Sequence, residues 1–178
     1  MGDAEPNLVL IGLRGSGKST LGARLAESLG RAFIDLDDVS AQQLGESSAG
    51  DAIANHGMDA FRRAEYEALE SVLHEPNRVI ALGGGTPTAD GCDSLLASDA
   101  CRVIYLKASP STLQDRLSTS DNSDRPSLTG AGVVDEVSDV FAQRDPLYMD
   151  IAESVIHVDG VGEDSVLTAL LALARAGI

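Results

Sequence analysis

Residues 12–19 read GLRGSGKS and fit the pattern G-x-x-x-x-G-K-[ST] at every fixed position. An apolar strand is expected before the motif, over 7–11, and an amphipathic helix after it, over 18–29. Glycines let the backbone wrap so tightly that successive N–H groups point at phosphate oxygens, and the helix N-terminus adds partial positive charge. The sequence therefore predicts a strand, a phosphate-binding loop and a helix in succession.

Two side chains of this loop carry specific chemistry. Lys18 is expected to lie between the β- and γ-phosphates of a nucleotide, and the Ser19 hydroxyl is expected to ligate Mg²⁺. The chain has only one other lysine, Lys107, which argues against a glycine-rich turn that carries a surface lysine by chance. A GTPase switch is disfavoured, because no Asn precedes a Lys and the guanine-reading Asn-Lys-x-Asp element is therefore absent.

Length and composition narrow the class of protein. The chain has 178 residues, which predicts one domain over 1–178, and 43% of them are hydrophobic, which is typical of a folded chain. The formal net charge of −15 repels phosphate on average and argues against nucleic-acid binding. No apolar run is long enough to span a membrane, and the acidic start does not look like a secretory signal. We expect a cytoplasmic monomer, with structural roles for the cysteines and histidines: Cys92, Cys101, His56, His74 and His157.

Strand-like and helix-like segments alternate along the rest of the chain. Further strands are predicted over 32–36, 79–82, 102–106 and 155–158, and helices over 40–73 (broken near Gly45, Gly50 and Gly57), 110–117 and 164–176. This alternation predicts an α/β fold with a mostly parallel sheet and helices on both faces. Ligands bind at the carboxyl ends of the strands in such sheets, and every motif described here lies at or just after one of those ends.

An acidic group follows the second predicted strand. Alternate residues of an extended strand point the same way, so Asp35 and Asp37 are expected to face one cleft. One would support Mg²⁺, and the other would accept a proton from an acceptor hydroxyl or orient it. The alternative is helix capping, which we expect for Asp38.

Two further patterns suggest a binding site. In the helical segment FRRAE (61–65), Arg62 and Glu65 share a face, whereas Arg63 is expected to be solvated; the alternative for Arg62 and Glu65 is a surface ion pair. Gly83, Gly84 and Gly85 directly follow the third strand. Three successive glycines exceed what a turn needs, so the backbone is expected to approach another group closely there.

Arginines outside these patterns are candidates for anion binding, because the guanidinium group matches planar carboxylates and phosphates. Arg125 lies in the irregular segment 118–132, the one stretch suited to a lid, and Arg144 opens the sequence RDPLY, which is expected to follow a helix. Arg116, near the end of a predicted helix, is as well explained by interaction with the helix dipole.

Taken together, these motifs resemble those of shikimate kinases in order and in approximate spacing, from about residue 7 to the C-terminus. The resemblance implies a nucleoside-monophosphate-kinase-like P-loop fold with a five-stranded parallel sheet, a substrate-binding helical region at about 36–65 and a lid at about 118–132. It implies that ATP phosphorylates the 3-hydroxyl of shikimate, giving shikimate 3-phosphate and ADP on the route to chorismate and aromatic amino acids.

The resemblance also implies residue roles. ATP would be bound by Gly15, Ser16, Gly17, Lys18, Ser19, Thr20 and Arg125. Shikimate would be bound by Asp37, Arg62, Glu65, Gly83, Gly84, Gly85 and Arg144, with Glu65 holding the arginines and Gly84 in a Walker B-like element. Lys18, Asp37 and Arg125 would be catalytic, Asp37 as the base, and Ser19 and Asp35 would serve Mg²⁺.

Two alternatives stay open at this point. Another small-metabolite kinase, such as a gluconate kinase, would keep the phosphate loop without needing both carboxylate-binding arginines and the triple glycine. A nucleotide-binding relative that has lost catalysis would be expected to show damage at Lys18, Ser19, Asp37 or Arg125, and all four are intact. The sequence departs from the family at Met58, where a glutamate is frequent, so one acidic group near the site is missing.

Overall fold

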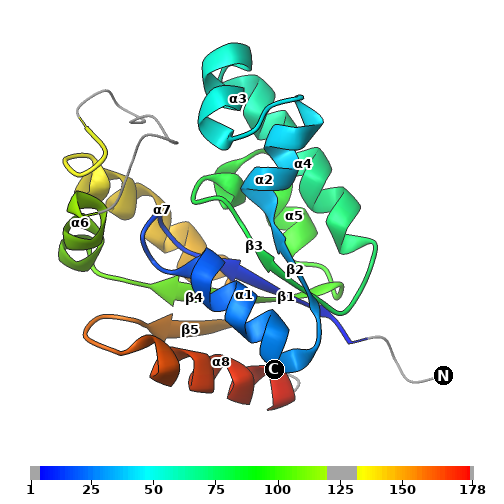
Figure 1. Cartoon of the computed structure of the whole chain (residues 1–178), viewed down its shortest axis with the longest axis vertical. Helices are drawn as coiled ribbons and strands as arrows, with labels where there is room; N and C mark the ends of the chain where they lie inside the picture. Colours follow the sequence, from blue (N-terminus) through cyan, green and yellow to red (C-terminus); the bar gives the residue numbers. More distant parts are fainter. Residues whose placement is uncertain (1–4, 120–131, 177–178) are drawn as a thin grey trace.

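The computed structural model of the protein describes residues 5–119 and 132–176 and is built on one parallel sheet (Figure 1). The strands are β1 (Asn7–Ile11), β2 (Ala32–Asp35), β3 (Arg78–Ala81), β4 (Cys101–Lys107) and β5 (Ser154–His157). They lie in the order β2-β3-β1-β4-β5, and all neighbouring pairs are parallel. The predicted α/β class and the five strands are confirmed, with no strand end shifted by more than one residue.

Burial along the strands explains their composition. The central strand β1 is buried at every residue, as expected for a parallel strand covered on both faces, whereas the edge strands β2 and β5 are partly exposed. The register pairs Val9 of β1 with Ile80 of β3 and Val103 of β4, so three fully buried side chains meet at the centre of the sheet. This packing forms the main hydrophobic core.

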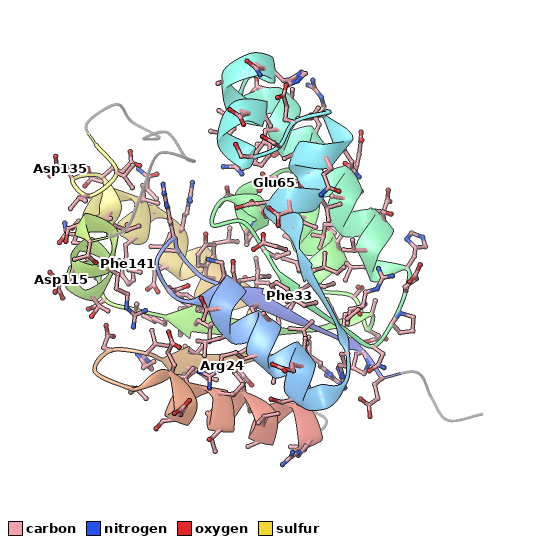
Figure 2. All side chains as sticks on the ribbon, in the orientation of Figure 1. Arg24, Phe33, Glu65, Asp115, Asp135 and Phe141 are labelled. Atoms are coloured by element: carbon pink, nitrogen blue, oxygen red, sulfur yellow. The ribbon has the colours of Figure 1, made fainter. Side chains whose placement is uncertain are left out.

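Helices cover both faces of the sheet. Helix α1 (Lys18–Leu29) lies across one face with α8 (Glu163–Ala176) beside it, and α5 (Cys92–Leu96) and α7 (Val137–Ile151) lie behind the sheet (Figure 1). Arg24 points from α1 toward α8, where it pairs with Glu163 and Asp164 (Figure 2). A Cβ on Gly22 of α1 would lie 2.7 Å from the ring of Phe33, so glycine lets this helix pack closely on β2.

A group of three helices stands beyond the carboxyl end of β2 (Figure 1): α2 (Leu36–Gln43), α3 (Ala49–His56) and α4 (Met58–Leu73). It has a small hydrophobic cluster of its own, formed by Ala41, Ala49, Ala52 and Phe61. The predicted breaks near Gly45 and Gly57 are confirmed, but the break at Gly50 is wrong. Gly50 lies inside α3, because Ser48 caps this helix and accepts a hydrogen bond from the backbone N–H of Asp51.

Three other local predictions need correction. The chain turns helical at Leu36, so Asp37 lies in the first turn of α2 rather than on an extended strand. Asp35, not Asp38, is the cap, because its Oδ1 accepts from the N–H of Asp37 at 3.2 Å. The segment 144–148 lies inside α7 rather than after a helix, although Pro146 interrupts the hydrogen-bond ladder there.

The remaining elements are η1, a short 3-10 helix (Thr86–Thr88), and α6 (Pro110–Ser118). Because all strands are parallel, the segments that leave their carboxyl ends emerge at one edge of the sheet. Residues 12–19 leave β1, Asp35 ends β2, and residues 83–85 follow β3. The fold therefore brings the predicted motifs to the same edge. No helix in the described part of the chain has the length and apolar character needed to cross a membrane.

Candidate active site

The loop between β1 and α1, residues 12–19, is here called the phosphate loop. Gly15 and Gly17 have φ values of 85° and 97°, which side chains rarely adopt, so the loop's shape depends on glycine at both positions. Helix α1 begins at Lys18 and, in contrast to α2 and α3, has no acidic residue in its first turn and no side-chain cap within the described chain. The positive end of this helix is therefore available to an anion.

Lys18 is held within the phosphate loop. The residue is 8% exposed. Its Nζ donates to the carbonyl of Gly12 at 2.8 Å and to that of Leu13 at 3.0 Å. The Oγ of Ser16 is also buried and finds no hydrogen-bond partner within residues 5–119 and 132–176. A buried ammonium group and a buried hydroxyl on one small loop are suited to a polar, negatively charged ligand.

Ser19 and Asp35, the two predicted metal ligands, lie side by side. The Ser19 hydroxyl donates to Oδ2 of Asp35 at 2.6 Å, while the other oxygen of Asp35 caps α2. One hydroxyl and one carboxylate oxygen are the hard ligands that Mg²⁺ prefers when phosphates and water supply the others. Within the described ranges there is no group of three or more acidic, His or Cys side chains placed to hold a metal.

Residues 83–85, here called the glycine run, are close to a different group at each position. A Cβ on Gly83 would overlap Oδ1 of Asp37, and one on Gly85 would overlap the guanidinium of Arg62. A Cβ on Gly84 would lie 3.3 Å from the backbone nitrogen of Arg14 in the phosphate loop. None of the three has positive φ, so glycine is needed here for space and not for backbone conformation. The predicted close approach is thereby explained residue by residue.

Arg62 and Glu65 form an ion pair on α4, in which Glu65 is buried and Arg62 is partly exposed. Arg62 Nη1 donates to Oε2 of Glu65, and the side chains are 23% and 1% exposed, respectively (Figure 2 labels Glu65). The other carboxylate oxygen, Oε1, accepts from the hydroxyl of Thr86. Burial raises the pKa of Glu65, while the charge of Arg62 and the hydrogen bond from Thr86 act in the opposite direction. The alternative of a surface ion pair is therefore wrong, whereas Arg63 is exposed as expected.

Arg144 reaches the glycine run from the opposite helix, α7. Its Nη1 donates to the carbonyl of Gly84 at 2.7 Å, and the hydroxyl of Tyr148, one turn further along α7, donates to the same oxygen. Burial raises the pKa of Tyr148 to about 12, so this hydroxyl stays protonated and acts as a donor at neutral pH. The carbonyl of Gly84 thus fixes α7 against the glycine run.

These residues line one pocket, here called the two-arginine pocket after Arg62 and Arg144. Its charged lining also includes Arg14, Asp37, Glu65 and Glu136, and Gly84 and Gly85 of the glycine run complete this part of the wall. Apolar side chains close two other sides, one from the helical group and one from α6 and α7: Ala49, Ile53, Met58, Phe61, Leu113, Leu117, Val137 and Val140. A small molecule that carries a carboxylate and hydroxyl groups would meet three guanidinium groups, three carboxyl groups and apolar side chains there.

Behind α7, a second polar group connects this helix to β4. Asp145 lies next to Arg144 in sequence and pairs with Nζ of Lys107 at 2.7 Å. It also accepts a hydrogen bond from the hydroxyl of Tyr105 at 2.9 Å. Lys107 further lies 5.6 Å from the ring centre of Phe141. These contacts hold the helix that carries Arg144 against the end of β4.

The structure brings together most of the residues selected from the sequence. Asp37, Arg62, Glu65, the glycine run and Arg144 meet at one pocket, and the phosphate loop with Lys18, Ser19 and Asp35 adjoins it through Gly84. Thr20 is exposed on α1 next to Ser19. Arg125 and most of the expected lid, 118–132, lie outside the described residues.

Sequence reasoning left one contributor undecided and missed another. Arg116, for which anion binding and interaction with the helix dipole were both open, donates from Nη1 to the carbonyl of Gly15 at 2.9 Å and so contacts the phosphate loop. Thr86 was not singled out, although it follows the glycine run directly. A usable signal existed for its partner: Glu65 interrupts the buried stripe of α4 formed by Phe61, Ala64, Ala68 and Leu69, and a carboxylate there requires donors.

Comparison with known proteins gives consistent matches over nearly the whole chain. The family described as Shikimate kinase matches residues 14–174. Shikimate kinase 2 of Yersinia enterocolitica is 39% identical over 168 residues, which are 94% of this chain and 95% of that protein. Shikimate kinase 2 of Yersinia pestis (strain Pestoides F) is 39% identical over 150 residues, or 84% of each chain.

Solved structures agree with these sequence matches. A shikimate kinase from Acinetobacter baumannii in complex with shikimate superposes with a TM-score of 0.87 at 28% identity, covering 97% of this chain and 94% of that one. A shikimate kinase from Bacteroides thetaiotaomicron gives a TM-score of 0.83 at 26% identity over 96% and 98% of the two chains. A sugar kinase from Janibacter sp. is similar in fold alone, with a TM-score of 0.64 at 15% identity over 94% of this chain and 93% of that one.

Proposed function

The chain belongs to the shikimate kinase family, and we propose that its phosphate loop and two-arginine pocket carry out the reaction of that family. In this reaction ATP phosphorylates the 3-hydroxyl of shikimate, and the products are shikimate 3-phosphate and ADP. The two parts of the site correspond to the two substrates, ATP at the phosphate loop and shikimate at the pocket.

One observation carries the assignment of the shikimate site. Arg62 from α4 and Arg144 from α7 approach adjacent residues of the glycine run, Gly85 and Gly84, and both line the pocket that contains Asp37. Two guanidinium groups beside adjacent residues of one pocket wall suit a carboxylate. The pairing of Arg62 with Glu65 holds this guanidinium in place at the wall.

At the phosphate loop, the proposed work is binding and charge neutralisation. Gly15, Ser16 and Gly17 would hold the phosphates through the backbone, with Ser19 and Thr20 following at the start of α1. Lys18, already confined to the loop, would counter the charge that develops on the transferring phosphoryl group. Because phosphoryl transfer depends mostly on positioning, a preformed loop supplies much of what the step needs.

Asp37 is the proposed base. Asp37 lines the pocket next to Gly83, and the residue is 6% exposed. There it would accept the proton of the 3-hydroxyl, while the two arginines fix the carboxylate at the other end of the ring. Fixing both ends of the acceptor aligns its hydroxyl for in-line attack and excludes water from that position.

The donor set of Ser19 and Asp35 fits Mg²⁺, with one hydroxyl and one carboxylate oxygen in contact. Bound there, Mg²⁺ would neutralise phosphate charge and orient the β- and γ-oxygens. Asp35 would keep its capping bond to Asp37 in that state, so the same residue would connect the metal position to the base.

Arg125 is proposed to bring a further positive charge to the ATP phosphates from the lid at about 118–132, most of which lies outside the described residues. We also propose a single-domain, monomeric enzyme that acts in the cytoplasm. Two buried, unpaired cysteines, Cys92 and Cys101, support the cytoplasm because neither depends on an oxidising compartment.

The test is an ADP-release assay with purified protein, ATP and Mg²⁺, in which shikimate, quinate and gluconate are compared as acceptors. We expect turnover with shikimate to exceed that with the other two acids by far. Turnover that is equal or greater with gluconate would favour another small-metabolite kinase, and ATP binding without any acceptor-dependent turnover would favour a non-catalytic relative. Light scattering on the same sample tests the monomer.

A further inference from the structure

Thr86 is the residue at which the glycine run becomes η1. Its side chain is completely buried, and its backbone N–H donates to the carbonyl of Gly83 at 3.1 Å. Its hydroxyl donates to Oε1 of Glu65, twenty-one positions away in the sequence. This hydroxyl does not line the two-arginine pocket, so it has no direct access to a substrate there.

Glu65 divides its two oxygens between two donors. Oε2 accepts from Arg62 and Oε1 from Thr86. A carboxylate buried to this extent needs both donors, because each lone pair left without a partner carries the full penalty of desolvation. Thr86 therefore stabilises the negative charge of Glu65 through the carboxylate oxygen that does not bond to Arg62.

We propose that Thr86 is a positioning residue of the shikimate site, whose hydroxyl holds the Glu65 carboxylate where it anchors the guanidinium of Arg62 beside Gly85. The chain of contacts runs from the hydroxyl of Thr86 to Glu65, from Glu65 to Arg62, and from Arg62 to the pocket. The inference rests on the proposed function, because it assigns Arg62 to the carboxylate of the acid substrate.

Several charged or titratable groups face Glu65. Arg62 on the same helix stabilises its charge, and Asp37 on α2 disfavours it. The Cys92 thiol on α5 and the Tyr148 hydroxyl on α7 also feel the charge of Glu65, and burial keeps both in the neutral form. Burial raises the pKa of Glu65 and Thr86 lowers it, so loss of the hydroxyl raises this pKa further. Glu65 then becomes protonated at a higher pH, so the range of pH in which Arg62 lacks an anionic partner becomes wider.

The experiment compares Thr86→Val, which keeps the shape and removes the hydroxyl, with Thr86→Ser, which keeps the hydroxyl and removes the methyl group. Steady-state constants for shikimate and for ATP are measured from about pH 5 to about pH 9, a range that lies above the ordinary pKa of a glutamate side chain. For Thr86→Val we expect the KM for shikimate to rise about tenfold, as for loss of one hydrogen bond to a buried charge. The KM for ATP should stay unchanged, and the acid limb of kcat/KM for shikimate should move to higher pH. Thr86→Ser should restore both values.

The proposal is overturned if Thr86→Val matches the wild type in KM for shikimate and in pH profile, or if Thr86→Ser is as impaired as Thr86→Val. Thermal melting checks that each variant folds. If Thr86→Val does not fold, Thr86→Ala and Thr86→Ser form a second pair that differs by the oxygen atom, with the same expected contrast. If the wild type itself does not phosphorylate shikimate, the proposed function fails instead, which the same assay shows before any variant is read.

Discussion

The phosphate loop and the two-arginine pocket lie on either side of the glycine run, but they are assembled differently. The phosphate loop takes its main groups from one short stretch, because Lys18 bonds to the carbonyls of Gly12 and Leu13 within the same loop. The pocket takes its polar groups from α2, α4, the glycine run and α7, together with Arg14 of the phosphate loop, and Arg62 and Arg144 are 82 positions apart in the sequence. The loop is thus a local structure, whereas the pocket exists only once the helices have packed.

Removal of the Lys18 side chain tests the phosphate loop and should have the largest effect on turnover. Lys18→Ala is expected to lower turnover by about a hundredfold to a thousandfold, because the charge that develops on the phosphoryl group loses a fixed partner. Shikimate binding, measured by titration calorimetry, should survive. The matched control is Lys107→Ala, the only other lysine of the chain, which should leave ATP affinity intact. A loss of shikimate affinity in Lys18→Ala would show that the two regions do not act separately.

Removal of either arginine tests the assembled side. Arg62→Ala and Arg144→Ala should each weaken shikimate binding by about a hundredfold or more while ATP still binds, because each loses a charge-assisted contact to the carboxylate. The two variants should differ in the free energy of unfolding. Arg62→Ala leaves the carboxylate of Glu65 buried without its partner, which costs about 3–5 kcal/mol, whereas Arg144→Ala leaves Tyr148 as a donor to Gly84.

The control for both is Arg63→Ala, since Arg63 lies beside Arg62 in the sequence but is exposed. Titration calorimetry measures the affinity of the three variants for shikimate and for ATP, and urea unfolding measures their free energy of unfolding. Equal loss of ATP affinity in Arg62→Ala and Arg144→Ala would contradict the assignment of these residues to the acid substrate.

A smaller effect is expected from the glycine run itself. The Cβ of Gly85→Ala would overlap the end of the Arg62 side chain, which is flexible enough to move aside. We therefore expect an intact fold, an unchanged KM for ATP and a KM for shikimate raised by about tenfold, comparable with one displaced charge-assisted hydrogen bond. Gly162→Ala is the control, because a Cβ there meets nothing within 4 Å and the backbone has no positive φ. An unchanged KM for shikimate in Gly85→Ala would show that Arg62 does not have to lie against the glycine run.

The smallest effect should come from the support behind α7. Lys107→Met removes a partly exposed ion pair with Asp145, of the kind that contributes up to about 1 kcal/mol, while the hydrogen bond from Tyr105 remains. We expect the KM for shikimate to rise by up to about fivefold and the KM for ATP to stay constant. An increase in the KM for ATP without one for shikimate would show that Lys107 supports the phosphate loop and not the two-arginine pocket.

The accuracy of the sequence-based predictions follows the same division. The phosphate loop, the strands and the breaks at Gly45 and Gly57 could be predicted, because short-range patterns determine them. The errors lie where a local rule was overridden. The segment 144–148 was expected to follow a helix but lies inside α7, and Gly50 was taken as a break although Ser48 starts a helix just before it. Asp37 was placed on a strand that ends two residues earlier.

What the sequence alone determined is therefore the α/β class, the nucleotide-binding loop and the choice of Asp37, Arg62 and Arg144 as candidates. Only the tertiary structure decided that Arg62 and Arg144 reach adjacent residues of the glycine run, that Arg116 contacts the phosphate loop and that Thr86 donates to Glu65. The physical reason is range. Backbone conformation and hydrophobic periodicity depend on neighbours within a few residues, whereas the position of a buried charge depends on donors that packing brings from distant parts of the chain.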